Sequence, residues 1–150
     1  MPSDLTDLYQ EVILDHSRHP RNFGAGENSN RSARGNNPLC GDRVTVYLTV
    51  DGDRISHANF EARGCAISLA SASMMTEMIQ GKTVDEARTL FARFHGVVTG
   101  DELAEDDGEL AELEALSGIR EFPTRIKCAT LAWHAMTAAL DGSDEEIKTE

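Results

Sequence analysis

The residue pattern of positions 43–62 constrains the fold more than any other part of the chain. Aliphatic side chains occupy every second position of its first half, namely Val44, Val46, Leu48 and Val50. Strict alternation is typical of a β-strand with one face in the core. Asp51-Gly52 is a typical hairpin turn, and residues 55–62 supply a returning strand. We therefore predict an antiparallel β-hairpin.

A cysteine lies on each side of the predicted hairpin. Cys40 precedes the first strand, and Cys65 follows the second. The start of one strand and the end of its antiparallel partner lie at the same end of a hairpin, so Cys40, Asp42 and Cys65 should be close neighbours. The third cysteine, Cys128, would have to dock there from the C-terminal part of the chain. Three sulfurs and one carboxylate would then form a four-coordinate site of a kind that Zn²⁺ accepts.

The surroundings of two cysteines favour the ionised thiol. Cys65 and Cys128 are each predicted to begin a helix, and Arg125 and Lys127 shortly precede Cys128. A helix N-terminus and nearby cations both stabilise a thiolate, which is the form that binds metals and attacks electrophiles. The chain has no pair of cysteines separated by two residues, so from spacing alone separate cysteines packed as small hydrophobes remain an alternative.

The rest of the chain predicts mainly helices. Apolar periodicity and capping signals place them at about 5–19, 67–80, 83–96 and 128–140, with a short amphipathic helix near 110–116. Thr83 and Glu86 have the spacing of a capping box.

The composition of residues 20–38 predicts a long loop with a short edge strand. We expect His16 and His19 to be surface groups or to cap the C-terminal end of the first helix. The predicted fold class is α+β, with a small antiparallel sheet packed against several helices.

Composition is typical of a single cytosolic domain. The chain has 150 residues, of which 40% are hydrophobic, which is enough for one core. No stretch approaches the roughly 20 apolar residues of a membrane span, and the first residues lack the pattern of a signal peptide. We therefore expect a cytoplasmic protein without a membrane partner. In such a chain, an odd number of cysteines favours metal binding or thiol chemistry over a disulfide framework.

The net charge of −12 is concentrated in two tracts. Residues 99–116 carry eight acidic residues and no basic ones, and residues 141–150 carry five acidic residues against Lys148. The rest of the chain is neutral. Because no basic excess is available to displace phosphate counterions, nucleic acid is excluded as an expected partner. We expect the acidic tracts to be solvated surface, or in the case of 99–116 to meet a basic partner.

Four blocks of sequence, in order along the chain, resemble the SufU branch of the IscU/NifU N-terminal superfamily. They are Asn37-Pro38-Leu39-Cys40-Gly41-Asp42, Gly64-Cys65-Ala66-Ile67-Ser68, Gly81-Lys82-Thr83 and Phe122-Pro123-Thr124-Arg125-Ile126-Lys127-Cys128. The resemblance covers nearly the whole chain. It implies a single SufE/IscU-like domain over residues 1–150, with an acidic insertion at about 99–116.

Two features favour the SufU branch over IscU-type scaffolds. IscU-type proteins have a histidine immediately before the last cysteine, where this chain has Lys127, a residue that cannot bind metal while protonated. SufU-type proteins also carry an insertion ahead of the last cysteine, which the acidic segment resembles. Within this branch, the resemblance implies that Cys40, Asp42, Cys65 and Cys128 bind one Zn²⁺.

The resemblance further implies an enzyme, a zinc-dependent sulfurtransferase. Such a protein accepts persulfide sulfur from the cysteine desulfurase SufS and passes it to a downstream Suf scaffold for iron–sulfur cluster assembly. Ligand exchange would free Cys40 to attack the enzyme persulfide, while Arg125 would orient Cys40 or steady the anionic site. One alternative is an IscU-type scaffold that holds an Fe–S cluster on the same ligands. Another is a structural zinc module without thiol chemistry.

Overall fold

A small sheet forms one layer of this computed structural model, which describes residues 2–26, 29–38, 41–99, 116, 119, 122–142 and 147–148. Its strands are β1 (Arg31–Asn37), β2 (Asp42–Asp51), β3 (Arg54–Arg63) and β4 (Ile147–Lys148). They lie in the order β3-β2-β1-β4, with β1, β2 and β3 antiparallel and the two-residue β4 parallel to β1. The predicted hairpin is confirmed as β2 and β3. The short strand expected within residues 20–38 is β1.

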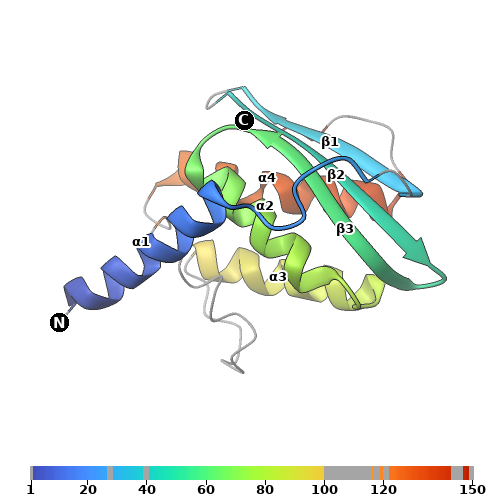
Figure 1. Ribbon diagram of the computed structural model, residues 1–150, viewed down its shortest axis with the longest axis horizontal. Helices are drawn as coiled ribbons and strands as arrows, with labels where there is room; N and C mark the ends of the chain where they lie inside the picture. The colour runs from blue at the N-terminus through green and yellow to red at the C-terminus, as the bar shows by residue number, and fades with distance from the viewer. Residues whose placement is uncertain are drawn as a thin grey trace.

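The helices form the second layer and lie on one side of the sheet (Figure 1). They are α1 (Pro2–Arg18), α2 (Ala66–Ile79), α3 (Val84–Thr99) and α4 (Pro123–Leu140). Helix α4 packs against β1 and β2, α2 packs against β3, α1 contacts α2, and α3 contacts α4. The predicted α+β class is therefore confirmed. No helix in the described part of the chain is long and apolar enough to cross a membrane.

Three predicted helix boundaries are wrong, and the first is the start of α1, which lies at Pro2 instead of about residue 5. Helix α4 begins at Pro123 instead of Cys128, because a proline in the first turn lacks only an N–H that would have no partner there and has a φ suited to the helix. Helix α3 continues through Gly96 to Thr99, because an interior glycine costs only about 1 kcal/mol relative to alanine. The predicted short helix near 110–116 falls almost wholly on residues outside the described ones. Leu116, which is described, is buried in the core.

The expectation that His16 would be exposed or cap its helix is also wrong. Its side chain is buried, with 3% of its surface exposed, because α1 packs against α2. Its Nδ1 lies 2.7 Å from the Ser73 hydroxyl oxygen, and its Nε2 lies 3.9 Å from a carboxylate oxygen of Glu77. His19 is exposed, as expected. His16 therefore fixes α1 onto α2 and is not available as a surface group.

The start of α3 is held by the predicted capping box. The Thr83 amide donates to a Glu86 carboxylate oxygen at 2.9 Å, and the Glu86 amide donates to the Thr83 hydroxyl oxygen at 3.1 Å. These bonds to Thr83 lower the pKa of the Glu86 carboxyl, because they stabilise its charged form. The box satisfies two backbone donors that the first turn of a helix leaves without partners.

Replacing Thr83 with alanine should lower the free energy of unfolding by about 1 kcal/mol, the usual cost of losing an N-cap. Urea denaturation followed by circular dichroism measures this change. Thr89→Ala makes the same chemical change at an exposed position in the same helix and should be close to neutral. Equal losses in the two variants would contradict a specific role for the cap.

Candidate metal centre

Three potential metal ligands converge at the end of the sheet where β2 begins and β3 ends. Asp42 is the first residue of β2, Cys65 follows β3, and Cys128 comes from α4. A carboxylate oxygen of Asp42 and the two Sγ atoms all lie within 4.8 Å of one another. In Figure 1 this is the end of the sheet from which the chain passes from β3 into α2. The hairpin argument therefore places Asp42 and Cys65 correctly, and α4 brings in Cys128.

Asp42 and Cys65 are joined through the backbone. The Cys65 amide donates to Asp42 Oδ1 at 2.9 Å, and Cys65 Sγ lies 3.8 Å from Asp42 Oδ2. Asp42 is fully buried. Gly64, between β3 and Cys65, has a φ of +154° and passes so close to Asp42 that a Cβ atom would lie 2.2 Å from Oδ1. The carboxylate can occupy this position only because residue 64 has no side chain.

Cys65 is the N-cap residue of α2. Its φ and ψ of −73° and 166° are extended, and its Sγ accepts a hydrogen bond from the Ser68 amide at 3.4 Å. An N-cap side chain normally satisfies an amide of the first helical turn in this way. Cys65 is partly exposed, unlike the other two ligands. The expectation that Cys65 introduces a helix is therefore confirmed.

Cys128 does not occupy the position in its helix that the sequence predicts. It lies within α4, one turn beyond the first residues of the helix, and it is fully buried. The prediction that Cys128 begins a helix is therefore wrong, because the helix already starts at Pro123. Instead of a helix-end amide, the side-chain Nδ2 of Asn37 lies 3.8 Å from Cys128 Sγ and donates to it.

Asn37 is the site residue that the sequence reasoning missed. It is the last residue of β1, it is fully buried, and it pairs with Asp42 across the sheet. Ala33 and Gly35, the two preceding alternate residues of β1, also point inward. The alternation of buried residues in β1 could have indicated Asn37. Recognising it requires the bounds and register of β1, which the sequence of residues 20–38 does not show clearly.

The donor set fits a thiophilic metal ion. Two sulfurs and one carboxylate oxygen are ligands that Zn²⁺ accepts, with sulfur at about 2.3 Å and oxygen at about 2.0–2.2 Å. Asp42 and Cys128 are fully buried, and an anionic group away from water is costly unless a cation or hydrogen bonds compensate it. A divalent cation between the three groups would supply this compensation. The described part of the site can therefore hold a metal ion.

Two further residues are predicted for this site, Cys40 and Arg125. Cys40, the expected fourth ligand and nucleophile, lies outside the described residues. Arg125 is exposed in the first turn of α4, three residues before Cys128, and Lys127 is partly buried. His134 is apart from the group of three ligands, and its ring forms a T-shaped pair with Phe91 at a centroid distance of 5.0 Å. Burial, with a smaller contribution from the charge of His95, lowers the pKa of His134.

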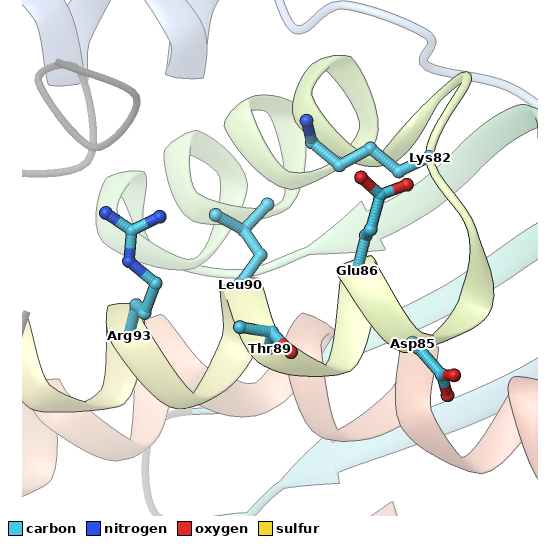
Figure 2. A pocket seen from close by; sticks show the side chains of 6 residues that line it. All are labelled: Lys82, Asp85, Glu86, Thr89, Leu90 and Arg93. Atoms are coloured by element: carbon cyan, nitrogen blue, oxygen red, sulfur yellow. The ribbon is translucent and has the colours of Figure 1, made fainter. Parts of the chain in front are cut away.

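A separate surface hollow lies over the start of α3 (Figure 2). It is lined by Lys82, Asp85, Glu86, Thr89, Leu90 and Arg93 and has a volume of about 320 Å³. Figure 2 shows Glu86 and Leu90 between Lys82 and Arg93, with Asp85 directed away. Glu86 already serves the capping box. The described residues that line the hollow include no cysteine or histidine.

The sequence of this chain is similar to those of known proteins. Residues 8–148 match the family model described as "NifU-like N terminal domain". The chain is 45% identical over 134 residues to "Zinc-dependent sulfurtransferase SufU" of Bacillus subtilis strain 168, covering 89% of this chain and 90% of that protein. It is 41% identical over 141 residues to "Iron-sulfur cluster assembly scaffold protein IscU" of Streptococcus pyogenes serotype M1, covering 94% of this chain and 87% of that protein.

A solved structure shares the fold. It is described as a candidate iron–sulfur cluster assembly scaffold for the SUF system from Fervidobacterium islandicum AW-1. The two chains superpose with a TM-score of 0.80 at 37% identity, covering 87% of this chain and 94% of that one. Sequence and fold therefore point to the same group of proteins.

Proposed function

The chain belongs to the NifU-like N-terminal domain family of iron–sulfur cluster assembly proteins, and we propose that within this family it acts as a zinc-dependent sulfurtransferase of the SufU type. In this proposal it accepts persulfide sulfur from the cysteine desulfurase SufS and passes it to a Suf scaffold. One observation carries the proposal: Asp42, Cys65 and Cys128 place one oxygen and two sulfurs within 4.8 Å of one another. The relative named as a zinc-dependent sulfurtransferase supports the choice of metal and reaction.

Each residue has a distinct part in the proposed reaction. Cys40, Asp42, Cys65 and Cys128 would hold the Zn²⁺. Bound zinc would keep the thiols deprotonated and attenuate them as nucleophiles until one is released. Cys65 and Cys128 remain in place, because α2 and α4 fix their backbones. Cys40 acts as the acceptor.

The transfer itself is a thiol exchange. The Cys40 thiolate attacks the terminal sulfur of the donor persulfide, and a new S–S bond forms at Cys40. The S–S bond of the donor breaks, and the donor cysteine leaves as a thiolate. Arg125, exposed one turn before Cys128, is the cation that we place beside this anionic exchange. No external oxidant or reductant is needed, because one persulfide is exchanged for another.

A desulfurase assay tests this function. Cysteine turnover by a SufS-type desulfurase is measured with reductant and without iron, adding zinc-loaded protein, zinc-stripped protein or the Cys40→Ala variant. We expect strong stimulation by the zinc-loaded protein and only the basal rate with the other two. His57→Ala, at an exposed position in β3, is the matched control and should stimulate fully. Full stimulation by Cys40→Ala would contradict the assignment of the acceptor.

A scaffold function is the second candidate. It is favoured by the 41% identity to the Streptococcus pyogenes protein named as an IscU scaffold. Anaerobic reconstitution with iron and sulfide distinguishes the two functions. A stable cluster that transfers to apo-proteins, together with no stimulation of the desulfurase, would support the scaffold. The sulfurtransferase proposal expects the reverse result, with Lys127 in place of the histidine that IscU-type proteins have there.

A further inference from the structure

Each of the three described ligands of the candidate metal centre accepts a specific hydrogen bond. Asp42 accepts from the Cys65 amide, and Cys65 accepts from the Ser68 amide. Cys128 accepts from the side chain of Asn37. The first two donors are backbone groups, which belong to the chain whatever the side chain. The third donor is a side chain and depends entirely on the identity of residue 37.

Strand β1 and helix α4 approach each other closely near Asn37. Gly35 lies two residues before Asn37 on the same inward face, and a Cβ atom at Gly35 would lie 2.9 Å from Leu131 Cδ1. Leu131 follows Cys128 by about one helical turn. The absence of a side chain at Gly35 therefore lets α4 lie close to β1, and this brings Cys128 Sγ within reach of Asn37 Nδ2.

Burying the Asn37 carboxamide would cost free energy if its polar atoms had no hydrogen-bond partners. Asn37 is fully buried beside a core of aliphatic and aromatic side chains. Burying an amide costs free energy unless its donors and acceptors are satisfied, and an apolar residue would fill the same space without that cost. An N–H···S bond to a thiolate ligand gives the carboxamide such a partner. Hydrogen bonds to ligand atoms also orient them and tune the metal.

We infer that Asn37 is a positioning residue that holds Cys128 as a permanent ligand of the metal centre. The inference rests on the proposed function, because it takes Cys128 as a ligand. The Asn37 N–H draws electron density from the Cys128 sulfur, which makes this sulfur a weaker electron donor and a weaker nucleophile. Low local polarity strengthens the effect, because the bond is buried. Cys128 is therefore less reactive in sulfur exchange, and another thiolate carries out the reaction.

Cobalt substitution tests the inference on the full chain. Wild type, Asn37→Ala and Asn37→Leu are loaded with Co²⁺, and their visible and near-ultraviolet spectra are recorded. Loss of the N–H donor should shift the sulfur-to-cobalt charge-transfer band to lower energy, while the d–d bands of a four-coordinate ion remain. Zinc affinity, measured by competition with a chromophoric chelator, should fall by about 10- to 100-fold, because the loss of the orientation of Cys128 outweighs the stronger donation by its sulfur.

Alkylation gives a second readout. The zinc-loaded proteins are treated with N-ethylmaleimide, and the modified cysteines are identified by peptide mapping. The ratio of modification at Cys128 to modification at Cys65 should rise in the Asn37 variants. Asn36→Ala, at the adjacent position on the opposite face of β1, is the control and should leave both band and ratio unchanged. The leucine variant keeps the space filled, so it can be measured if the alanine variant does not fold.

The outcomes separate the two proposals. An unchanged charge-transfer band and an unchanged alkylation ratio in a folded Asn37 variant would overturn the role of Asn37, even if thermal stability fell. A wild-type protein without a four-coordinate Co²⁺ spectrum would instead overturn the metal site of the proposed function. If the band shifts but wild type fails to stimulate a desulfurase, the positioning role stands and the sulfurtransferase proposal fails.

Discussion

Replacing Gly64 with alanine is expected to abolish tight metal binding and, with it, stimulation of the desulfurase. The new Cβ would lie 2.2 Å from Asp42 Oδ1 and 2.8 Å from Asp42 Cγ, closer than non-bonded atoms can approach. The φ of +154° is also unfavourable for alanine. The clash cannot be relieved by a flexible tip, because Asp42 is fully buried and its Oδ1 accepts the Cys65 amide. Either the carboxylate or Cys65 must move.

The measurement is zinc affinity by chelator competition, followed by the desulfurase assay. Gly52→Ala is the matched control. Gly52 also has a positive φ, of +64°, but it lies in the turn at the opposite end of the same hairpin, where a new Cβ would meet no atom within 4 Å beyond the adjacent residues. This variant should lose some stability and keep the metal. Wild-type affinity in Gly64→Ala would show that the carboxylate is not needed where the structure places it.

Replacing Trp133 with alanine is expected to have the largest effect on stability. Trp133 is fully buried and stacks on Phe94 and Phe91 of α3 at centroid distances of 4.8 and 5.8 Å. Its indole N–H donates to the Ser71 hydroxyl at 3.0 Å, and that hydroxyl donates to the Ala129 carbonyl at 2.5 Å. One side chain thus joins α2, α3 and α4. Large-to-small changes of this kind cost about 3–5 kcal/mol.

Urea denaturation of the metal-loaded protein, followed by circular dichroism, measures this loss. Circular dichroism is required because Trp133 is the only tryptophan of the chain. Trp133→Phe keeps a ring but removes the N–H, so it should lose less than the alanine variant. Leu14→Ala, at a position 40% exposed on α1, should change stability little. A loss below about 1 kcal/mol in Trp133→Ala would mean that the three helices do not depend on this contact, since full truncation of such a core residue costs more.

Local sequence patterns predict the elements that depend only on residues close to one another in the chain. The alternation from Val44 to Val50 and the Asp51-Gly52 turn were sufficient for the hairpin, and Thr83 with Glu86 marked the start of α3. The predicted start of α4 at Cys128 is five residues too late, because apolar periodicity does not show that the helix begins at Pro123, although proline is favoured in a first turn. His16 was misplaced because its burial depends on α1 packing against α2, and no feature near His16 reports that contact.

The site was predicted to the extent that it depends on one hairpin. Asp42 and Cys65 follow from antiparallel pairing, whereas the docking of Cys128 depends on how α4 lies across the sheet. Family resemblance, and not spacing, supplied that assignment. Asn37 could not be predicted, because its role depends on the register of β1 against β2 and on the close approach at Gly35. Contacts between distant elements are the part that periodicity does not encode.

The order of the elements along the chain also determines when the three candidate ligands can meet during synthesis. Asp42 and Cys65 are made early and can meet as soon as β2 and β3 pair, but Cys128 belongs to α4, near the end of the chain. A nascent chain therefore offers an incomplete set of ligands until α4 has left the ribosome and packed against β1 and β2. In the proposed function, truncated products that lack α4 would therefore lack Cys128 and could not complete the metal centre.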